Sequence, residues 1–267
     1  MNQKMQKTDA IGATLVVGMG EVGAALADVL EKHRPVLRHD IEPCDFEQPI
    51  DVMHICFPFH HGGFVDAACR YIERFKPRLT VINSTVLPGT SRAIAERTCA
   101  PVAYSPVRGK HVRMAQDLLR YAKFVAATDI DTAAYVERHF QAAGMKTART
   151  SRPETLELAK LAETTYFGAL IAFAQELNRY AERIDADYFE ITSFFEEIDF
   201  LPRTRYFPGF IGGHCVIPNI ELLLRLAETP LLRSILDSNN RRAIELGEKT
   251  SSAPHANGST TVRHSDG

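Results

Sequence analysis

A glycine-rich turn between a strand-like run and a helix-like run constrains this chain more than any other feature. ATLVVG (13–18) is a short apolar run, and GEVGAALADVLEKH (20–33) follows it with helical spacing. Their junction carries Gly18, Gly20 and Gly23 in the pattern G-x-G-x-x-G. These glycines permit a tight turn, let a pyrophosphate approach the backbone, and let helix and strand pack closely. The pattern predicts a dinucleotide-binding turn, although a glycine-rich turn that binds nothing stays an alternative.

An acidic residue at the end of the next strand-like run supports the dinucleotide interpretation. PVLRHDI (35–41) predicts a second strand, and Asp40 lies 17 residues (40 − 23) after Gly23, near the usual spacing of about 20. A carboxylate here accepts hydrogen bonds from the adenosine ribose and repels a 2′-phosphate, which favours NAD over NADP. Arg38 and His39 leave NADP open, because a cation can hold that phosphate. The predicted cofactor site comprises Gly18, Met19, Gly20, Glu21, Val22, Gly23, Asp40, Phe57, Pro58, Ser84 and Thr85.

Strand-like and helix-like segments alternate through the first half of the chain. Further strands are predicted at DVMHICFPF (51–59), LTVINST (79–85), VAYSPV (102–107), KFVAAT (123–128) and KTARTS (146–151). Helices are predicted at FVDAACRYIERF (64–75) and near 131–143. The alternation predicts an α/β fold, with a Rossmann-type parallel sheet and covering helices over residues 12–152.

Long helical patterns replace this alternation in the second half. One pattern runs unbroken over 153–184 with Pro153 in its first turn, and another spans 221–246 with an interruption at Pro230. Between them, YFPGFIGGHCVIPN (206–219) is a loop that is dense in glycine and proline yet carries His214 and Cys215, as functional loops do. We expect a helical substrate and dimerisation domain over 153–248, a flexible leader over 1–11 and a disordered tail over 249–267.

Composition and charge exclude several classes of protein. Hydrophobic residues make up 45% of the 267 residues and charged residues 24%, which is typical of a globular protein with a sizeable core. The net charge of −2 offers no basic surplus for a nucleic acid, and no apolar run resembles a signal peptide or a membrane span. The five cysteines form no CxxC pair and favour reduced thiols in the cytoplasm. No set of histidines and cysteines has the spacing of a metal site.

Three further motifs follow the glycine-rich turn in a fixed order. They are NSTVLPGT (83–90), ELAKLAETTYFGALIAFAQEL (157–177) and GFIGGHCVIP (209–218). Together the four motifs resemble the UDP-glucose/GDP-mannose dehydrogenase family over roughly residues 12–247, most closely its branch acting on UDP-N-acetyl-hexosamines. The resemblance implies NAD as cofactor and a sugar or sugar nucleotide as substrate, whose C6 alcohol is oxidised in two steps to a carboxylate through a cysteine-bound intermediate. It also implies a homodimer that pairs through the long helix.

The resemblance assigns roles to individual residues. It makes Cys215 the nucleophile, Lys160 the residue that assists proton transfer and stabilises the oxyanion, and Thr85 the residue that positions a water. The residue types suit this chemistry, because a neighbouring ammonium favours a thiolate and a buried lysine can act as a base. Plainer interpretations stay open: Cys215 as a small buried hydrophobic residue and Lys160 as a solvated helix residue. His214 is either a proton carrier or a hydrogen-bonding residue of the loop.

The chain departs from the family pattern at several positions. Val107, in SPVRGK, stands where the family has a glutamate, and Thr164 and Gln175 stand at two asparagine positions. Asn219 lies nearest to the family's catalytic aspartate, and a carboxamide does not take a proton as a carboxylate does. The sequence also stops before the expected C-terminal domain that binds UDP in the family. Two other functions therefore stay open: a two-electron dehydrogenase of the β-hydroxyacid type, and an NAD-binding protein without turnover.

Overall fold

The computed structural model describes residues 12–42, 44, 46–59, 63–109, 111–195, 198–201 and 206–247. The predicted leader over 1–11 and the predicted tail over 249–267 lie outside these residues. The chain divides into two compact units. The first contains the residues up to Tyr166 together with Pro218–Glu228, and the second contains Phe167–Ile217 and the residues from Thr229 onward.

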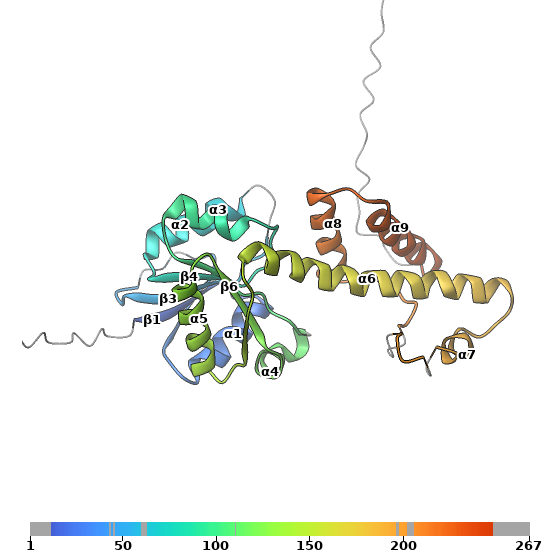
Figure 1. Cartoon of the computed structure of the whole chain (residues 1–267), viewed down its shortest axis with the longest axis horizontal. Helices are drawn as coiled ribbons and strands as arrows, with labels where there is room; N and C mark the ends of the chain where they lie inside the picture. Colours follow the sequence, from blue (N-terminus) through green and yellow to red (C-terminus); the bar gives the residue numbers. More distant parts are fainter. Residues whose placement is uncertain are drawn as a thin grey trace, which may run out of the picture. The chain divides into compact units, whose positions relative to one another are not determined.

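A seven-stranded sheet with the order β2-β1-β3-β4-β5-β6-β7 forms the first unit (Figure 1). Its strands are β1 (Ala13–Val17), β2 (Val36–His39), β3 (Ile50–Ile55), β4 (Leu79–Ile82), β5 (Val102–Tyr104), β6 (Lys123–Ala127) and β7 (Thr147–Arg149). Neighbouring strands from β2 to β5 are parallel, whereas β6 is antiparallel to β5 and β7 follows the direction of β6. The predicted Rossmann-type α/β fold is confirmed with a mostly parallel sheet, in which β6 and β7 run opposite to the other strands. The reason is that the chain re-enters the sheet beside the end of β5 instead of crossing back to its start.

Helices cover both faces of this sheet (Figure 1). The helices of the first unit are α1 (Glu21–Glu31), α2 (Phe64–Phe75), α3 (Thr90–Thr98), the 3-10 turn η1 (His111–Arg113), α4 (Met114–Arg120) and α5 (Ile130–Ala142). One apolar core joins α1, α4 and α5 to the sheet, and a second joins α2 and α3 to its other face. Strand β1 contributes Val16 to the first core and Leu15 and Val17 to the second, since side chains alternate along a strand. This burial on both faces explains why its sequence reads as a continuous apolar run.

Helices follow the sheet in sequence. They are α6 (Pro153–Arg183), α7 (Tyr188–Ser193), α8 (Val216–Leu226) and α9 (Pro230–Glu245). The predicted helix over 153–184 and the predicted break at Pro230 are confirmed. At that break Thr229 caps α9, because its hydroxyl accepts a 3.4 Å hydrogen bond from the N–H of Leu232. The predicted loop over 206–219 is too long by four residues, because α8 begins at Val216 and tolerates Pro218 in its first turn.

Candidate active site

The glycine-rich turn after β1 depends on its glycines in two different ways. Gly18 has a φ of +92°, and a Cβ on it would lie 2.6 Å from the backbone nitrogen of Phe57. A Cβ on Gly23 would lie 1.8 Å from the carbonyl oxygen of Gly18, so the fold itself requires both glycines. A Cβ on Gly20, in contrast, would meet nothing within 4 Å among the described residues. The backbone at Gly20 is therefore open to an incoming group at the N-terminus of α1, where an anion is favoured.

Asp40 lies beside this turn, as the sequence predicts. Its Oδ2 accepts a 3.3 Å hydrogen bond from the N–H of Met19. The guanidinium of Arg38 binds Asp28 and Glu31 on α1, at 2.8 Å and 2.7 Å. The ring of His39 packs edge-on against Tyr71 and Phe75, and its burial, together with the charge of Arg74, lowers its pKa. The two side chains that left NADP open are thus engaged with protein groups.

The remaining predicted cofactor residues lie at the ends of two adjacent strands or in the glycine-rich turn. The hydroxyl of Ser84, after β4, donates a 2.6 Å hydrogen bond to the carbonyl of Phe57, after β3. Pro58 is exposed and Thr85 is half-buried. Met19 and Val22 pack against the core that contains α1, and Glu21 begins that helix. The structure therefore brings Gly18, Phe57 and Ser84 together at the carboxyl end of the sheet, where ligands of open α/β sheets bind.

Lys160, Thr164 and Asn219 belong to the first unit. The Lys160 ammonium lies 3.1 Å from the carboxylate of Glu163, and its side chain is only 13% exposed. One turn later, the Thr164 hydroxyl accepts a 2.9 Å hydrogen bond from the amide of Asn219 on α8. The same hydroxyl donates to the carbonyl of Leu161 at 3.0 Å. The structure thus brings together Thr164 and Asn219, both of which the sequence analysis singles out as candidate site residues.

Glu157 is a site residue that the sequence analysis missed. Its carboxylate is fully buried and accepts the N–H groups of Gly89, at 2.6 Å, and Ser91, at 2.9 Å. Burial raises the pKa of Glu157, and these hydrogen bonds oppose that effect. This contact ties the helix that carries Lys160 to the NSTVLPGT segment that carries Thr85. The sequence signal for Glu157 was an acidic residue about one helical turn before Lys160.

A chain of buried polar groups runs beneath the same edge of the sheet. Lys123 donates to Oδ1 of Asn83 at 3.1 Å and to the carbonyls of Ser105 and Pro106. Burial lowers the pKa of Lys123 to about 7. The amide of Asn83 lies 3.2 Å from Nδ1 of His54, which extends the chain into the core. Lys123 therefore fixes the backbone just before Val107.

The side chain of Val107 is buried in the apolar core that contains α1. An apolar side chain at this position cannot take the place of the acid that the family has there, because it can neither accept nor release a proton.

The predicted nucleophile lies in the second unit. Cys215 is half-buried and directly precedes Val216, the first residue of α8, while His214 is exposed. Gly213 has a φ of +81°, a backbone conformation that favours glycine. The N–H groups at the start of a helix favour negative charge, which suits a thiolate at this position.

Among the described residues, no cluster of three or more histidine, cysteine, aspartate or glutamate side chains could hold a metal ion. No helix in the same part of the chain is long and apolar enough to cross a bilayer.

Comparison with known proteins finds similarity to sugar-nucleotide dehydrogenases. Residues 154–241 match the model of the UDP-glucose/GDP-mannose dehydrogenase family, central domain. A UDP-N-acetyl-D-mannosamine dehydrogenase of Methanocaldococcus jannaschii is 24% identical over 211 residues, which are 77% of this chain and 47% of that protein. The enzyme of the same name from Pyrococcus horikoshii is 25% identical over 180 residues, 62% of this chain and 42% of that protein. The chain thus spans less than half the length of these curated relatives.

A solved structure supports the fold independently. The structure of a UDP-D-ManNAc dehydrogenase from Pyrococcus horikoshii superposes with a TM-score of 0.76 at 20% identity, over 88% of this chain and 70% of that one. The sheet order and the glycine-rich turn define a dinucleotide-binding fold of the Rossmann type, followed by helices. Residues 154–241 are thus similar to the central domain of the UDP-glucose/GDP-mannose dehydrogenase family. This match agrees with the resemblance carried by the sequence motifs.

Proposed function

We propose that this chain oxidises the C6 alcohol of a sugar nucleotide towards a carboxylate, with NAD as cofactor and Cys215 as the nucleophile. The observation that carries the proposal is that the segment matching the central domain, residues 154–241, includes Lys160, Thr164 and Cys215. The relatives that match most of this chain are named as dehydrogenases of a UDP-sugar. Our proposal adds a uronate product and a cysteine-bound intermediate, which the names of these relatives do not state.

The residues at the glycine-rich turn fit a dinucleotide. Gly20 leaves the backbone open to a pyrophosphate, and Asp40 offers a carboxylate to the adenosine ribose. The two ion pairs of Arg38 support NAD, because its Nη2 is held by Asp28 and Glu31 and their carboxylates would repel a 2′-phosphate. When bound, NAD supplies the acceptor for the two electrons that leave the substrate carbon.

Side chains of this protein would transfer the protons and form the covalent intermediate. Lys160 would take the proton of the alcohol and then stabilise the oxyanion with its ammonium. The Cys215 thiolate would add to the aldehyde carbon and form a thiohemiacetal, whose oxidation gives a thioester that water hydrolyses to the carboxylate and the free thiol. Thr85 would position that water, while Thr164 and Asn219, held together at 2.9 Å, would bind substrate oxygens. His214 would act at the same loop as a proton carrier.

The test is the amount of NADH formed per product. The protein is incubated with NAD and a panel of UDP-sugars, GDP-sugars, free sugars and hydroxy acids, and NADH and carboxylate are both quantified. We expect two NADH per carboxylate with a sugar nucleotide and loss of that product in Cys215→Ala. The matched control is Cys99→Ala, because Cys99 is an exposed cysteine directly after α3 in the first unit. One NADH per product, unaffected by Cys215→Ala, would identify a two-electron dehydrogenase instead. Binding of NAD without NADH formation from any substrate would identify a binding protein.

We further propose a homodimer that pairs through α6 and works in the cytoplasm. Tyr166, Phe173 and Tyr180 are spaced by seven residues on one face of this helix, and each is about half exposed or more. A second copy of the same helix offers an equally apolar stripe. No disulfide joins any two of the five cysteines, which supports a reducing compartment.

A further inference from the structure

The loop that carries Cys215 is held by side chains instead of secondary structure. Residues 206–215 form neither helix nor strand, so their backbone groups need other partners. Asn239 on α9 supplies two of them at Ile211. Its Oδ1 accepts the N–H of Ile211 at 2.7 Å, and its Nδ2 donates to the carbonyl of Ile211 at 3.2 Å. One side chain thus pairs with both backbone groups of one residue, as a neighbouring strand would.

Gln175 on α6 holds the same loop two residues earlier. Its Nε2 donates to the carbonyl of Gly209 at 2.7 Å and reaches Oδ1 of Asn239 at 3.3 Å. Its Oε1 accepts a 3.0 Å hydrogen bond from the hydroxyl of Ser238. Gln175, Ser238 and Asn239 are all almost completely buried. An unpaired amide in such a place is costly, so each partner fixes the orientation of the next.

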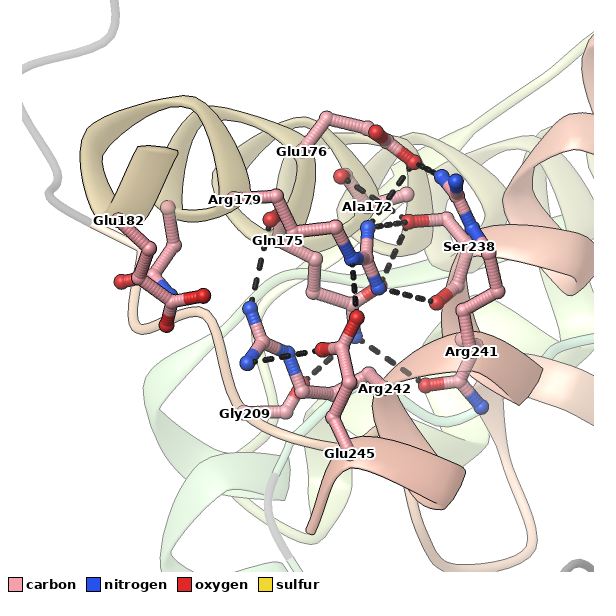
Figure 2. Close-up of polar contacts among 12 residues, drawn as sticks. Ala172, Gln175, Glu176, Arg179, Glu182, Gly209, Ser238, Arg241, Arg242 and Glu245 are labelled. Carbon is pink, nitrogen blue, oxygen red and sulfur yellow. Dashed lines mark hydrogen bonds and ion pairs between the residues drawn. The ribbon is translucent and has the colours of Figure 1, made fainter. Parts of the chain in front are cut away.

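A charged layer fixes the orientation of Ser238 in turn. Figure 2 shows Arg179 between Ser238, Glu176 and Glu245. The guanidinium donates to the hydroxyl of Ser238 at 3.1 Å and to its carbonyl at 2.9 Å, and binds Glu245 at 2.6 Å. Since the Ser238 hydroxyl accepts from Arg179, its own proton is available to Gln175. The donated hydrogen bonds therefore run from Arg179 through Ser238 and Gln175 to Asn239. Asn239 then exchanges two hydrogen bonds with Ile211 of the loop.

We propose that Asn239 and Gln175 are positioning residues that hold the cysteine loop in one backbone conformation and thereby set the orientation of Cys215. The proposal rests on the proposed role of Cys215 as nucleophile. Only four residues, 212–215, separate the anchored Ile211 from the first residue of α8. Two of them are Gly212 and Gly213, which impose little conformational preference of their own. The anchor at Ile211 therefore adds order to a segment whose two glycines impose little of their own.

The first test measures the anchor itself, by hydrogen–deuterium exchange of the loop in the full chain. In Asn239→Ala, the Ile211 amide should exchange at least about tenfold faster than in the wild type, because its acceptor is lost. The control is Asn240→Ala, since Asn240 is the exposed neighbour of Asn239 on the same helix. Unchanged exchange at Ile211 in Asn239→Ala would overturn the proposal. This readout needs no substrate, so it decides the anchoring even if the proposed oxidation fails.

The second test separates positioning from general stability. With the sugar nucleotide that gives turnover, Asn239→Ala should lower kcat at least about tenfold while leaving the Kd of NAD within about twofold, because the dinucleotide residues lie in the other unit. If Asn239→Ala does not fold, Gln175→Met serves as the second variant. It conserves the volume of the side chain and removes the hydrogen bond donated to the carbonyl of Gly209. Equal kcat in Gln175→Met, Asn240→Ala and the wild type would overturn the proposal. A fall in kcat together with an equal loss of NAD affinity would also overturn it, since that result indicates global destabilisation.

Discussion

The Nε2 atoms of His54, on β3, and His139, on α5, lie 2.9 Å apart in the core of the first unit. Lys123 donates to Oδ1 of Asn83, so the amide nitrogen of Asn83 faces Nδ1 of His54. His54 then carries its proton on Nε2 and donates it to His139. Neither ring can gain a second proton without placing two N–H groups against each other or a charge in the core. Burial lowers the pKa of His139 to about 3 and lowers that of His54 well below its ordinary value.

The first prediction is a loss of stability in mild acid. Both histidines are neutral in the folded protein but bind protons below pH 6.5 in the unfolded chain. The free energy of unfolding should therefore fall as the pH drops from 6.5 towards 3, by up to about 1.4 kcal/mol per pH unit for each histidine. Urea denaturation at pH 7, 6 and 5 measures this slope. His139→Leu should lower stability at pH 7 yet flatten the slope, whereas the exposed His33→Leu should leave it unchanged. An equal slope in all three proteins would contradict the prediction.

The second prediction concerns cofactor choice. Asp40→Ala should raise the Kd of NAD roughly tenfold, because hydrogen bonds to the ribose are lost, and should affect NADP less. Titration of each dinucleotide by calorimetry measures both constants. Glu42→Ala is the control, because Glu42 is an exposed acid two residues along the chain. If Asp40→Ala binds NAD as the wild type does, the assignment of the ribose site to Asp40 is wrong.

The third prediction concerns the buried acid that holds the loop of Thr85. In Glu157→Gln one carboxylate oxygen becomes an NH₂ group that faces a backbone N–H. The free energy of unfolding should fall by about 1–3 kcal/mol, and turnover should fall with it. Glu154→Gln on the same helix turn should change stability far less, since its partners Arg92 and Arg152 are exposed side chains. Chemical denaturation of both variants makes the comparison, and equal losses would remove any special role for Glu157.

The fourth prediction addresses the proposed dimer. Phe173→Glu places a charge in the middle of the exposed stripe on α6 and should shift the mass measured by light scattering from two chains to one. Glu182→Lys is the control, because nine residues at about 100° each place it on the opposite side of the helix. A wild-type protein that is already monomeric at micromolar concentration would contradict the dimer.

Local features of the fold could be predicted from the sequence, whereas contacts between distant segments could not. Gly18 and Gly23 act within one turn, so their spacing was enough to predict the strand, the turn and the helix. The helix that starts at Pro153 and the break at Pro230 were equally local. Asn239 and Ile211 are 28 residues apart, and Glu157 and Gly89 are 68 apart. Neither pair leaves a periodic signal, because each depends on how separate helices and loops pack.

The reversed direction of β6 and β7 shows the same limit. Both segments were predicted correctly as strands, but the direction in which a strand joins a sheet depends on the connection before it. The motifs identified Cys215 and Lys160 as candidates, yet gave no indication of the amides that hold the cysteine loop.

Glu157 and Lys160 share one helix, and Glu157 grips the backbone at Gly89 and Ser91. An inserted residue between them would turn the lysine about 100° around the helix axis, while Glu157 kept its hydrogen bonds to Gly89 and Ser91. The three-residue interval from Glu157 to Lys160 therefore sets the angle of the lysine side chain relative to the segment that contains Thr85. Natural relatives should vary in length before Glu157 or beyond α6, but not between these two residues.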